Sequence, residues 1–355
     1  MTSQHATIAS LAADVLAGLA DARSALIYAP NTIGKTRLAQ YLKERDPESV
    51  VLYNSFVEDV FTWDNEQVVL KMDLKSELLE TIVTQGLDTA IVDSFQAFTG
   101  GRIEPRIDFE SGEISFGIHK GDDSSAEGIK ISRAEESIFV WSVYYSVLNE
   151  AIDTLGDSPD LRSTTGYDQI TLAVIDDPVS SMDDVRIVSV ALALAELVKR
   201  SSGLGLKFVI ATHHALFFNV LFNSLRGKKN QAYVLQNKPV AGWSLKKQSN
   251  DSPFSYHLGI VEDIQSAIAA NAIERSHFNQ FRALLEKTAN FLGHSGGWGD
   301  LLTGPDAVLL TKILNLYSHD RFSDMDSSEV AEEYKEALKG EFQEFLKTFR
   351  WAAAA

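Results

Sequence analysis

The sequence predicts an α/β fold that is followed by a mainly helical region. Short apolar runs, typical of strands buried on both faces of a sheet, alternate with segments of helical periodicity. Strand patterns stop after about residue 255, and helical patterns fill the chain from there to residue 349. We therefore expect two domains, residues 1–257 and residues 258–355. Strands are expected at residues 24–28, 50–53, 170–175 and 207–211, and helices at residues 6–19, 35–45, 137–152 and 187–199.

Two β-hairpins complete the expected α/β domain. Residues 107–118 alternate apolar and polar side chains around Ser111 and Gly112, and residues 232–236 and 243–247 form a second strand pair. The second hairpin lies in a segment without Asp or Glu, residues 197–250. This basic segment would hold an RNA phosphate backbone or dock against an acidic partner. Its cations are Lys199, Arg200, Lys207, Arg226, Lys228, Lys229, Lys238, Lys246 and Lys247.

The composition is that of a folded, acidic protein. Of 355 residues, 45% are hydrophobic and 23% are charged, and the formal net charge of −17 disfavours non-specific adhesion to nucleic acid. The absence of cysteine excludes a disulfide framework and a thiolate zinc site, and it fits a cytoplasmic protein. The longest strongly apolar run, residues 187–195, is far shorter than the roughly 20 residues of a membrane span, so we expect no membrane partner.

A phosphate-binding loop is expected between the strand at residues 24–28 and the helix at residues 35–45. The segment A-P-N-T-I-G-K-T matches the Walker A pattern G-x-x-x-x-G-K-[ST] except at its first position, where Ala29 replaces glycine. Its backbone N–H groups would surround the phosphates, and Thr36 would bind Mg²⁺. A chance match is the alternative, but the order of strand, loop and helix disfavours it. The expected phosphate ligands are Asn31, Thr32, Ile33, Gly34 and Lys35. Of these, Lys35 would reach the β- and γ-phosphates.

A pair of carboxylates follows the strand at residues 170–175. Asp176 would hold Mg²⁺ directly or through water, and Asp177 would orient or deprotonate the attacking water. Adjacent carboxylates at the end of a buried strand are costly unless a cation is present. The alternative is a solvated turn before Pro178.

These motifs resemble those of ABC-type ATPases, and most specifically the PrrC/RloC branch of bacterial defence ATPases. The run D-D-P-V-S-S-M-D at residues 176–183 is similar to that family's Walker B motif and D-loop, and F-V-I-A-T-H-H at residues 208–214 is similar to its switch-histidine strand. The resemblance implies an ABC-type P-loop ATPase core with a β-hairpin subdomain, with ATP and Mg²⁺ as its cofactors. It implies that His213 contacts the γ-phosphate and that Asp183 lies at the nucleotide.

A degenerate signature motif stands between these two halves of the site. Residues 131–135, I-S-R-A-E, resemble the Leu-Ser-Gly-Gly-Gln/Glu signature of ABC proteins, with both glycines replaced. The resemblance implies that Ser132 and Arg133 contact the nucleotide of a second subunit, so that ATP is sandwiched in a homodimer or higher oligomer. The alternative is a serine N-cap with acidic residues in the first helical turn.

The C-terminal region continues the resemblance. PrrC-like anticodon nucleases carry an Arg, a Glu four residues later and a His some thirty residues beyond, and Arg282, Glu286 and His319 fit that pattern. The resemblance implies metal-free cleavage of tRNA, with His319 as acid/base and Arg282 stabilising charge at phosphorus. The alternative is an ordinary helix ion pair, because residues four apart share a helix face.

Two functions remain open from the sequence. In the first, ATP-driven dimerisation controls an RNase in the protein's own C-terminal domain. In the second, the chain is an ATPase sensor or scaffold that restrains or activates a separate toxin or nuclease subunit. A phage-encoded trigger is a further expected partner in either case.

Overall fold

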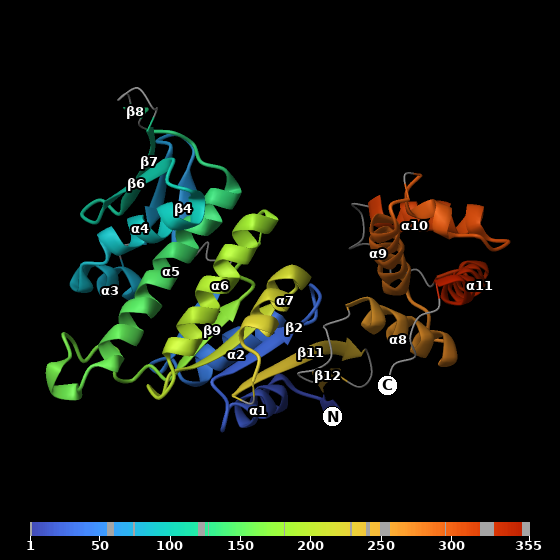
Figure 1. Ribbon diagram of the computed structural model, residues 1–355, viewed down its shortest axis with the longest axis horizontal. Helices are drawn as coiled ribbons and strands as arrows, with labels where there is room; N and C mark the ends of the chain where they lie inside the picture. The colour runs from blue at the N-terminus through green and yellow to red at the C-terminus, as the bar shows by residue number, and fades with distance from the viewer. Residues whose placement is uncertain are drawn as a thin grey trace. The chain divides into compact units, whose positions relative to one another are not determined.

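The computed structural model divides into two compact units, Met1–Pro253 and Phe254–Ala355 (Figure 1). The division lies four residues before the boundary expected from the sequence, among residues outside the described part of the chain. The structure describes residues 2–54, 60–73, 75–119, 125–126, 128–180, 182–227, 229–238, 242–248, 256–294, 296–319 and 330–349.

The N-terminal unit is built on a seven-stranded sheet of order β1-β12-β11-β2-β10-β9-β3. The strands from β11 to β3 are parallel, and β12 and β1 extend the sheet in antiparallel fashion. All residues of β2 and β9 are buried, which confirms the expectation of strands covered on both faces. The bounds are β1 (Thr2–His5), β2 (Ser24–Tyr28), β3 (Val50–Asn54), β9 (Leu172–Asp176), β10 (Lys207–Thr212), β11 (Asn230–Lys238) and β12 (Gly242–Lys247).

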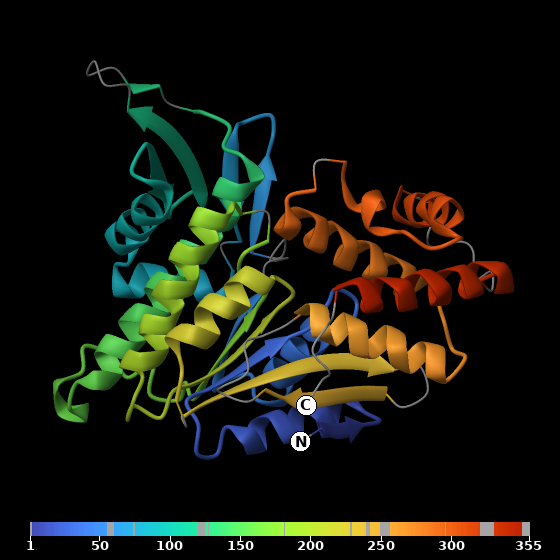
Figure 2. The same cartoon turned by 45° about the vertical axis from the view of Figure 1, so that its right-hand side comes forward.

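Helices cover both faces of this sheet, which gives three layers (Figure 2). Successive strand residues point to opposite faces. Ile27 therefore packs in the core formed with α1 (Ile8–Gly18) and α2 (Lys35–Arg45), whereas Tyr28 meets Phe218 of α7 with ring centroids 5.7 Å apart. The second helical layer consists of α5 (Arg133–Gly156), α6 (Asp184–Arg200) and α7 (Ala215–Ser224).

A smaller antiparallel sheet forms the second part of the N-terminal unit. Its order is β4-β5-β7-β6, and β8 pairs with β7. The hairpin expected around Ser111 and Gly112 is confirmed, because β6 and β7 pair on either side of them. Phe116 of β7 packs against Phe95 and Phe139 at centroid distances of 6.0 and 5.4 Å. The elements here are β4 (Phe61–Asp64), β5 (Val69–Met72), α3 (Glu77–Gln85), α4 (Asp88–Thr99), β6 (Ile103–Asp108), β7 (Glu113–His119), β8 (Ser125–Ala126) and the 3₁₀ turn η1 (Pro159–Leu161).

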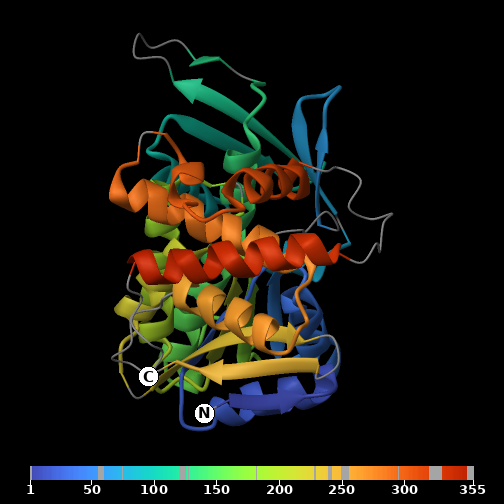
Figure 3. The same cartoon turned by 90° about the vertical axis from the view of Figure 1, so that its right-hand side faces the viewer.

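In the C-terminal unit, every element among the described residues is a helix or a 3₁₀ turn, as expected from the sequence (Figure 3). Its core is aromatic: Phe281 lies edge-on to Phe342 and Phe345, with centroids 5.2 and 5.6 Å apart. Across the described chain, no helix combines the length and apolarity that crossing a membrane requires. The elements are α8 (Tyr256–Ala269), α9 (Arg275–Leu292), the 3₁₀ turn η2 (Trp298–Leu301), α10 (Ala307–His319) and α11 (Glu332–Phe349).

A buried carboxylate ties α11 to the start of α10. Glu341 is only 1% exposed, and its two oxygens accept hydrogen bonds from the backbone N–H groups of Gly304 and Asp306 at 3.0 and 2.9 Å. A Cβ atom at residue 304 would lie 2.4 Å from a Glu341 carboxylate oxygen, so a larger residue there would displace this carboxylate. A negative charge before a helix N-terminus is also favoured by the helix dipole.

Replacement of Glu341 tests this interaction. Glu341→Ala removes the acceptor of two half-buried N–H groups, so we expect the free energy of unfolding of the C-terminal unit to fall by about 2 kcal/mol. Glu344→Ala is the control, because that side chain is 43% exposed and its ion pair with Lys347 spans 3.1 Å at the surface. We expect the control to change stability by less than about 0.5 kcal/mol. Urea unfolding followed by circular dichroism measures both, and equal effects would contradict the assignment.

Candidate functional site

The sheet topology brings three motifs to one edge. Strands β2, β10 and β9 are neighbours and parallel, so their carboxyl ends lie together. Thr212 pairs with Tyr28, and Ala211 pairs with Asp176. The loop after β2, the histidines after β10 and the carboxylates at the end of β9 therefore converge, although they are far apart in sequence.

The loop between β2 and α2 has the conformation of an anion-binding loop. The strand ends at Tyr28 and the helix begins at Lys35, as the motif predicts. Thr32 and Gly34 adopt left-handed backbone angles, with φ of 69° and 107°. The first N–H groups of an α-helix have no acceptor within the helix and carry partial positive charge. This loop therefore presents donors to an anion at the sheet edge.

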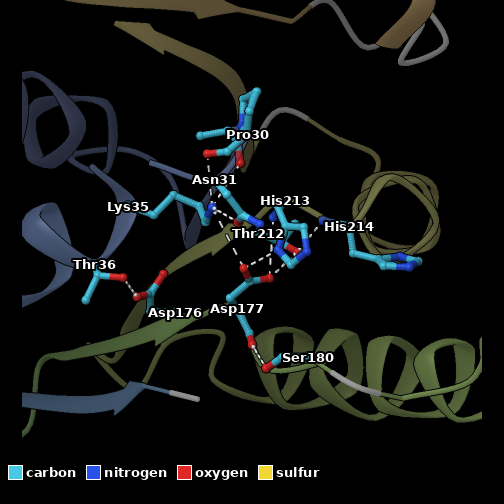
Figure 4. A network of polar contacts seen from close by, with 11 residues as sticks. Pro30, Asn31, Lys35, Thr36, Asp176, Asp177, Ser180, Thr212, His213 and His214 are labelled. Atoms are coloured by element: carbon cyan, nitrogen blue, oxygen red, sulfur yellow. Dashed lines mark hydrogen bonds and ion pairs between the residues drawn. The ribbon is translucent and has the colours of Figure 1, made fainter. Parts of the chain in front are cut away.

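Lys35 is buried in this loop and held by its backbone (Figure 4). Its Nζ donates to the carbonyl oxygens of Ala29 and Pro30 at 3.1 Å each, and to the Asn31 side-chain oxygen at 3.2 Å. An oxygen of Asp177 lies 3.8 Å away. Burial lowers the pKa of Lys35, and the neighbouring carboxylates oppose that effect only in part.

Asp176 and Thr36 bring together oxygen atoms that could hold a magnesium ion. The Thr36 hydroxyl donates to one Asp176 oxygen at 2.6 Å, and the other carboxylate oxygen is buried without a hydrogen-bond partner. Burial raises the pKa of this carboxyl, which is 1% exposed. Mg²⁺ in proteins takes one or two side-chain oxygens and completes its shell with phosphates and water. Among the described residues, no group of three or more His, Asp or Glu is arranged to hold a metal by itself.

Asp177 is the most heavily engaged residue of the site. One of its oxygens contacts Nδ1 of His213, and the other accepts from the Thr212 hydroxyl at 3.0 Å. Burial by itself would raise the pKa of Asp177, but His213, Lys35 and Thr212 together hold it below its usual range. Its backbone is in the left-handed region, with φ of 54°, a conformation that costs on the order of 1 kcal/mol in a non-glycine residue.

A tryptophan that the sequence did not single out supports the phosphate loop from β12. Nε1 of Trp243 donates to the Ile33 carbonyl oxygen at 2.7 Å. A Cβ atom on Gly34 would lie 3.1 Å from that nitrogen, and the Arg37 guanidinium lies 5.5 Å from the centroid of the indole ring. Gly34 is therefore favoured both by its backbone angle and by its contact with an indole.

Three further residues that were expected to lie at a nucleotide are found at helix N-termini. Ser132 caps α5 in a capping box with Glu135, so the N-cap geometry weighed as an alternative is present. Arg133 is the exposed first residue of the same helix. Asp183 caps α6 and pairs with Arg186 at 3.0 Å. Among the described contacts none joins these three to the phosphate loop, and Ser181 of the D-loop run lies outside the described residues.

The basic hairpin is present as β11 and β12. Lys246 and Lys247 are exposed at the end of β12. Lys228 and the side chain of Lys238 lie outside the described part of the chain. The structure thus places two of the expected cations on the surface of this hairpin.

In the C-terminal unit, Arg282 joins three elements. It donates to Glu286 at 2.8 Å, and to the Leu314 carbonyl and the Asn315 side-chain oxygen of α10 at 3.2 and 3.0 Å. Its guanidinium also lies 5.1 Å from the ring centroid of Trp298 in η2. His319 is the last residue of α10, and its side chain is outside the description. The structure therefore brings Arg282 and Glu286 together and adds three neighbours that the sequence did not predict, Leu314, Asn315 and Trp298.

Comparison with known proteins decides the family. No family model matches the sequence. The chain is 37% identical over 344 residues to a protein of Escherichia coli named anticodon nuclease, and the match covers 88% of this chain and 86% of that protein. The chain belongs to the anticodon nuclease family. Membership confirms the resemblance that residues 176–183, 208–214 and 282–319 indicated.

Solved structures that resemble this family member include heads of SMC proteins and an ABC-transporter subunit. An Smc head bound to the C-winged helix domain of ScpA has a TM-score of 0.35 at 8% identity, covering 66% of this chain and 92% of that chain. The SMC head of Thermotoga maritima scores 0.33 at 11%, covering 64% and 90%. The cbiO1 protein of Clostridium perfringens scores 0.31 at 12%, covering 60% and 73%. At these TM-scores the resemblances carry no functional conclusion.

Asp176→Asn and Asp177→Asn are expected to change stability in opposite directions. The pKa of Asp176 is raised by burial, so its ionised form destabilises the native state at neutral pH, and an amide removes that effect. The pKa of Asp177 is lowered, so its stabilising effect is present above its unfolded-state pKa and is lost as pH falls through the lower native-state value. We expect shifts of about +1 and −1 kcal/mol, respectively, in the free energy of unfolding.

Urea unfolding of the nucleotide-free protein in EDTA measures these shifts. The Asp177→Asn deficit should persist from neutral pH to about pH 4 and shrink below it, because the carboxyl group of the unfolded wild-type chain then takes up a proton and the native carboxylate follows at its lower pKa. Two shifts of the same sign at neutral pH would show that the charge balance described here is wrong.

Proposed function

We propose that the N-terminal unit binds and hydrolyses ATP with Mg²⁺ and thereby controls an RNase in the C-terminal unit that cleaves tRNA in the anticodon loop. One observation carries the proposal. The match to the Escherichia coli anticodon nuclease leaves 12% of this chain uncovered, whereas the unit Phe254–Ala355 makes up about 29% of it. The match therefore extends from the ATPase-like unit well into the helical unit, which supports a function that needs both.

The nucleotide would be held by the loop that now encloses Lys35. Backbone N–H groups of residues 31–36 would bind the phosphates, and Thr36 with the unpartnered oxygen of Asp176 would hold Mg²⁺. When bound, the ion neutralises charge that develops on the phosphates during transfer. Lys35 would exchange its carbonyl acceptors for phosphate oxygens, which are stronger acceptors for an ammonium group.

Asp177 would orient the attacking water and accept its proton. In the structure its two oxygens are occupied by His213, Thr212 and, at longer range, Lys35. Nucleotide phosphates would compete for Lys35 and His213, because both donate to anions. The release of Asp177 from these contacts would then be coupled to the filling of the site.

A second copy of the chain would complete the site. Ser132, Arg133 and Asp183 lie at the start of α5 and α6, where N–H groups and charge favour anions and hydrogen-bond acceptors. Among the described contacts these residues do not reach the phosphate loop of their own unit. We infer that they contact the nucleotide held by the partner, so that ATP joins two heads.

The RNase step would be an attack of the ribose 2′-oxygen on the adjacent phosphorus. One acid/base group removes the 2′-OH proton, and a second protonates the 5′-oxygen as the bond from phosphorus to that oxygen breaks, leaving a 2′,3′-cyclic phosphate. His319 suits proton transfer near neutral pH, and Arg282 would stabilise the negative charge at phosphorus. Glu286, bonded to Nε of Arg282, would orient the guanidinium.

An ATPase scaffold for a separate toxin is the second candidate, and one observation favours it. Arg282 is only 17% exposed and is paired with Glu286, so the cluster also has the form of a structural ion pair. The two candidates differ in whether this chain cleaves RNA by itself.

Lys35→Ala tests the nucleotide site. The substitution removes the only side-chain charge in the loop, so we expect the affinity for Mg²⁺-ATP to fall by at least about 30-fold. Isothermal titration calorimetry measures the affinity, with Lys199→Ala as the control because Lys199 is exposed and pairs with Glu196 at 3.6 Å. Wild-type affinity in Lys35→Ala would remove the basis for the proposed site.

His319→Ala tests the RNase in the same chain. We expect purified wild-type protein to cleave tRNA, and His319→Ala to cleave it at least about 100-fold more slowly because proton transfer is lost. ATP hydrolysis should be unchanged. His294→Ala, another histidine of the unit, is the matched control and should cleave normally. If wild type and His319→Ala leave tRNA equally intact, the scaffold function stands instead.

A further inference from the structure

The Arg282 guanidinium is held from three sides within the C-terminal unit. Glu286 of the same helix accepts a hydrogen bond from Nε. The Leu314 carbonyl and the Asn315 side-chain oxygen of α10 accept from one terminal nitrogen. The indole ring of Trp298 in η2 lies against the planar face of the guanidinium. A guanidinium is planar with donors in a fixed fork, so these contacts determine both its plane and its rotation within that plane.

Asn315 connects this guanidinium to α10, the helix that ends at His319. Arg282 is on α9, and its bond to Asn315 spans 3.0 Å between the helices. A change at Asn315 would therefore alter the placement of Arg282 relative to α10.

The residue type at position 315 is informative. An aspartate there would accept the same hydrogen bond and would pair more strongly with Arg282, because bonds between ionised partners are stronger than bonds to a neutral amide. A second carboxylate beside Glu286 would, however, cancel the positive charge that a phosphate requires. A neutral amide holds the guanidinium without adding a second negative charge beside it.

Trp298 contributes differently. Its indole face lies 5.1 Å from the guanidinium carbon, within the range of a cation–π contact, and it covers one face of the cation. Covering that face excludes water and strengthens the interaction of the cation with any phosphate on its other side. An aromatic ring, and not merely an apolar side chain, is needed for this effect.

We propose that Asn315 and Trp298 are positioning residues that orient Arg282 toward the scissile phosphate. This proposal rests on the RNase function assigned above. A purely structural role predicts that Asn315→Asp is harmless or stabilising, because it adds an ion pair across α9 and α10. A positioning role predicts that the same substitution lowers the rate of cleavage.

Steady-state cleavage of a tRNA anticodon stem-loop by the full-length protein distinguishes these roles. We expect Asn315→Asp to lower kcat by about 10- to 100-fold, to change KM by less than roughly threefold, and to leave the urea midpoint unchanged or higher. Trp298→Leu should lower kcat similarly, and Trp298→Phe should restore most of it because the ring is kept. Leu316→Ala, 60% exposed on the next position of α10, is the control and should behave as wild type.

The outcomes separate the two levels of inference. If wild type cleaves the stem-loop and Asn315→Asp cleaves it at the same rate, the positioning role is overturned and the RNase function stands. The same holds if Trp298→Leu and Trp298→Phe do not differ. If the wild-type protein does not cleave the stem-loop in any nucleotide state, the RNase function fails, and the positioning role fails with it.

Discussion

Two adjacent carboxylates, Asp176 and Asp177, lie inside the protein at the end of β9, and the arrangement around them follows from that charge. They are 1% and 5% exposed, and ionised groups at such depth need compensation by hydrogen bonds or opposite charge. Asp177 obtains it from His213, Thr212 and Lys35. Asp176 obtains it only in part, because one of its oxygens has no partner. The negative charge of Asp177 is thus compensated by its neighbours, whereas that of Asp176 is compensated only in part. A cation bound at Asp176 would supply the missing positive charge.

The sequence predicted those parts of the fold and site that depend on local pattern. The strand, loop and helix around Lys35 have a fixed spacing, and β9 is a continuous apolar run that ends in two acids, so both could be found without the structure. The Ser132 capping box follows from a serine and a glutamate three residues apart. In each case the interacting residues are close in sequence, and their side-chain chemistry limits what they can do.

The remaining parts depend on contacts between distant segments. Trp243 reaches the Ile33 carbonyl from 210 residues away, and no periodicity at either residue marks the pair. Trp298 and Asn315 meet Arg282 only because α9, η2 and α10 pack together. The sequence placed Arg282 and Glu286 on one helix face, which the structure has, but it offered no signal for the groups that surround them. Such supports are set by tertiary packing, and side-chain type alone does not specify them.

Charged groups therefore organise both units in the same way. The nucleotide site and the Arg282 cluster each hold one buried or half-buried cation against carboxylate and amide oxygens. We propose that the nucleotide bound at the first site controls RNA cleavage at the Arg282 cluster. The most direct measurement is the rate at which the purified wild-type protein cleaves a tRNA anticodon stem-loop in Mg²⁺ with ATP, with ADP and with no nucleotide. We expect the cleavage rates to differ by at least about tenfold between nucleotide states. If nucleotide shifts the population of the cleavage-competent state, this difference is a coupling free energy of roughly 1.4 kcal/mol. Cleavage at one and the same rate in all three states would contradict it.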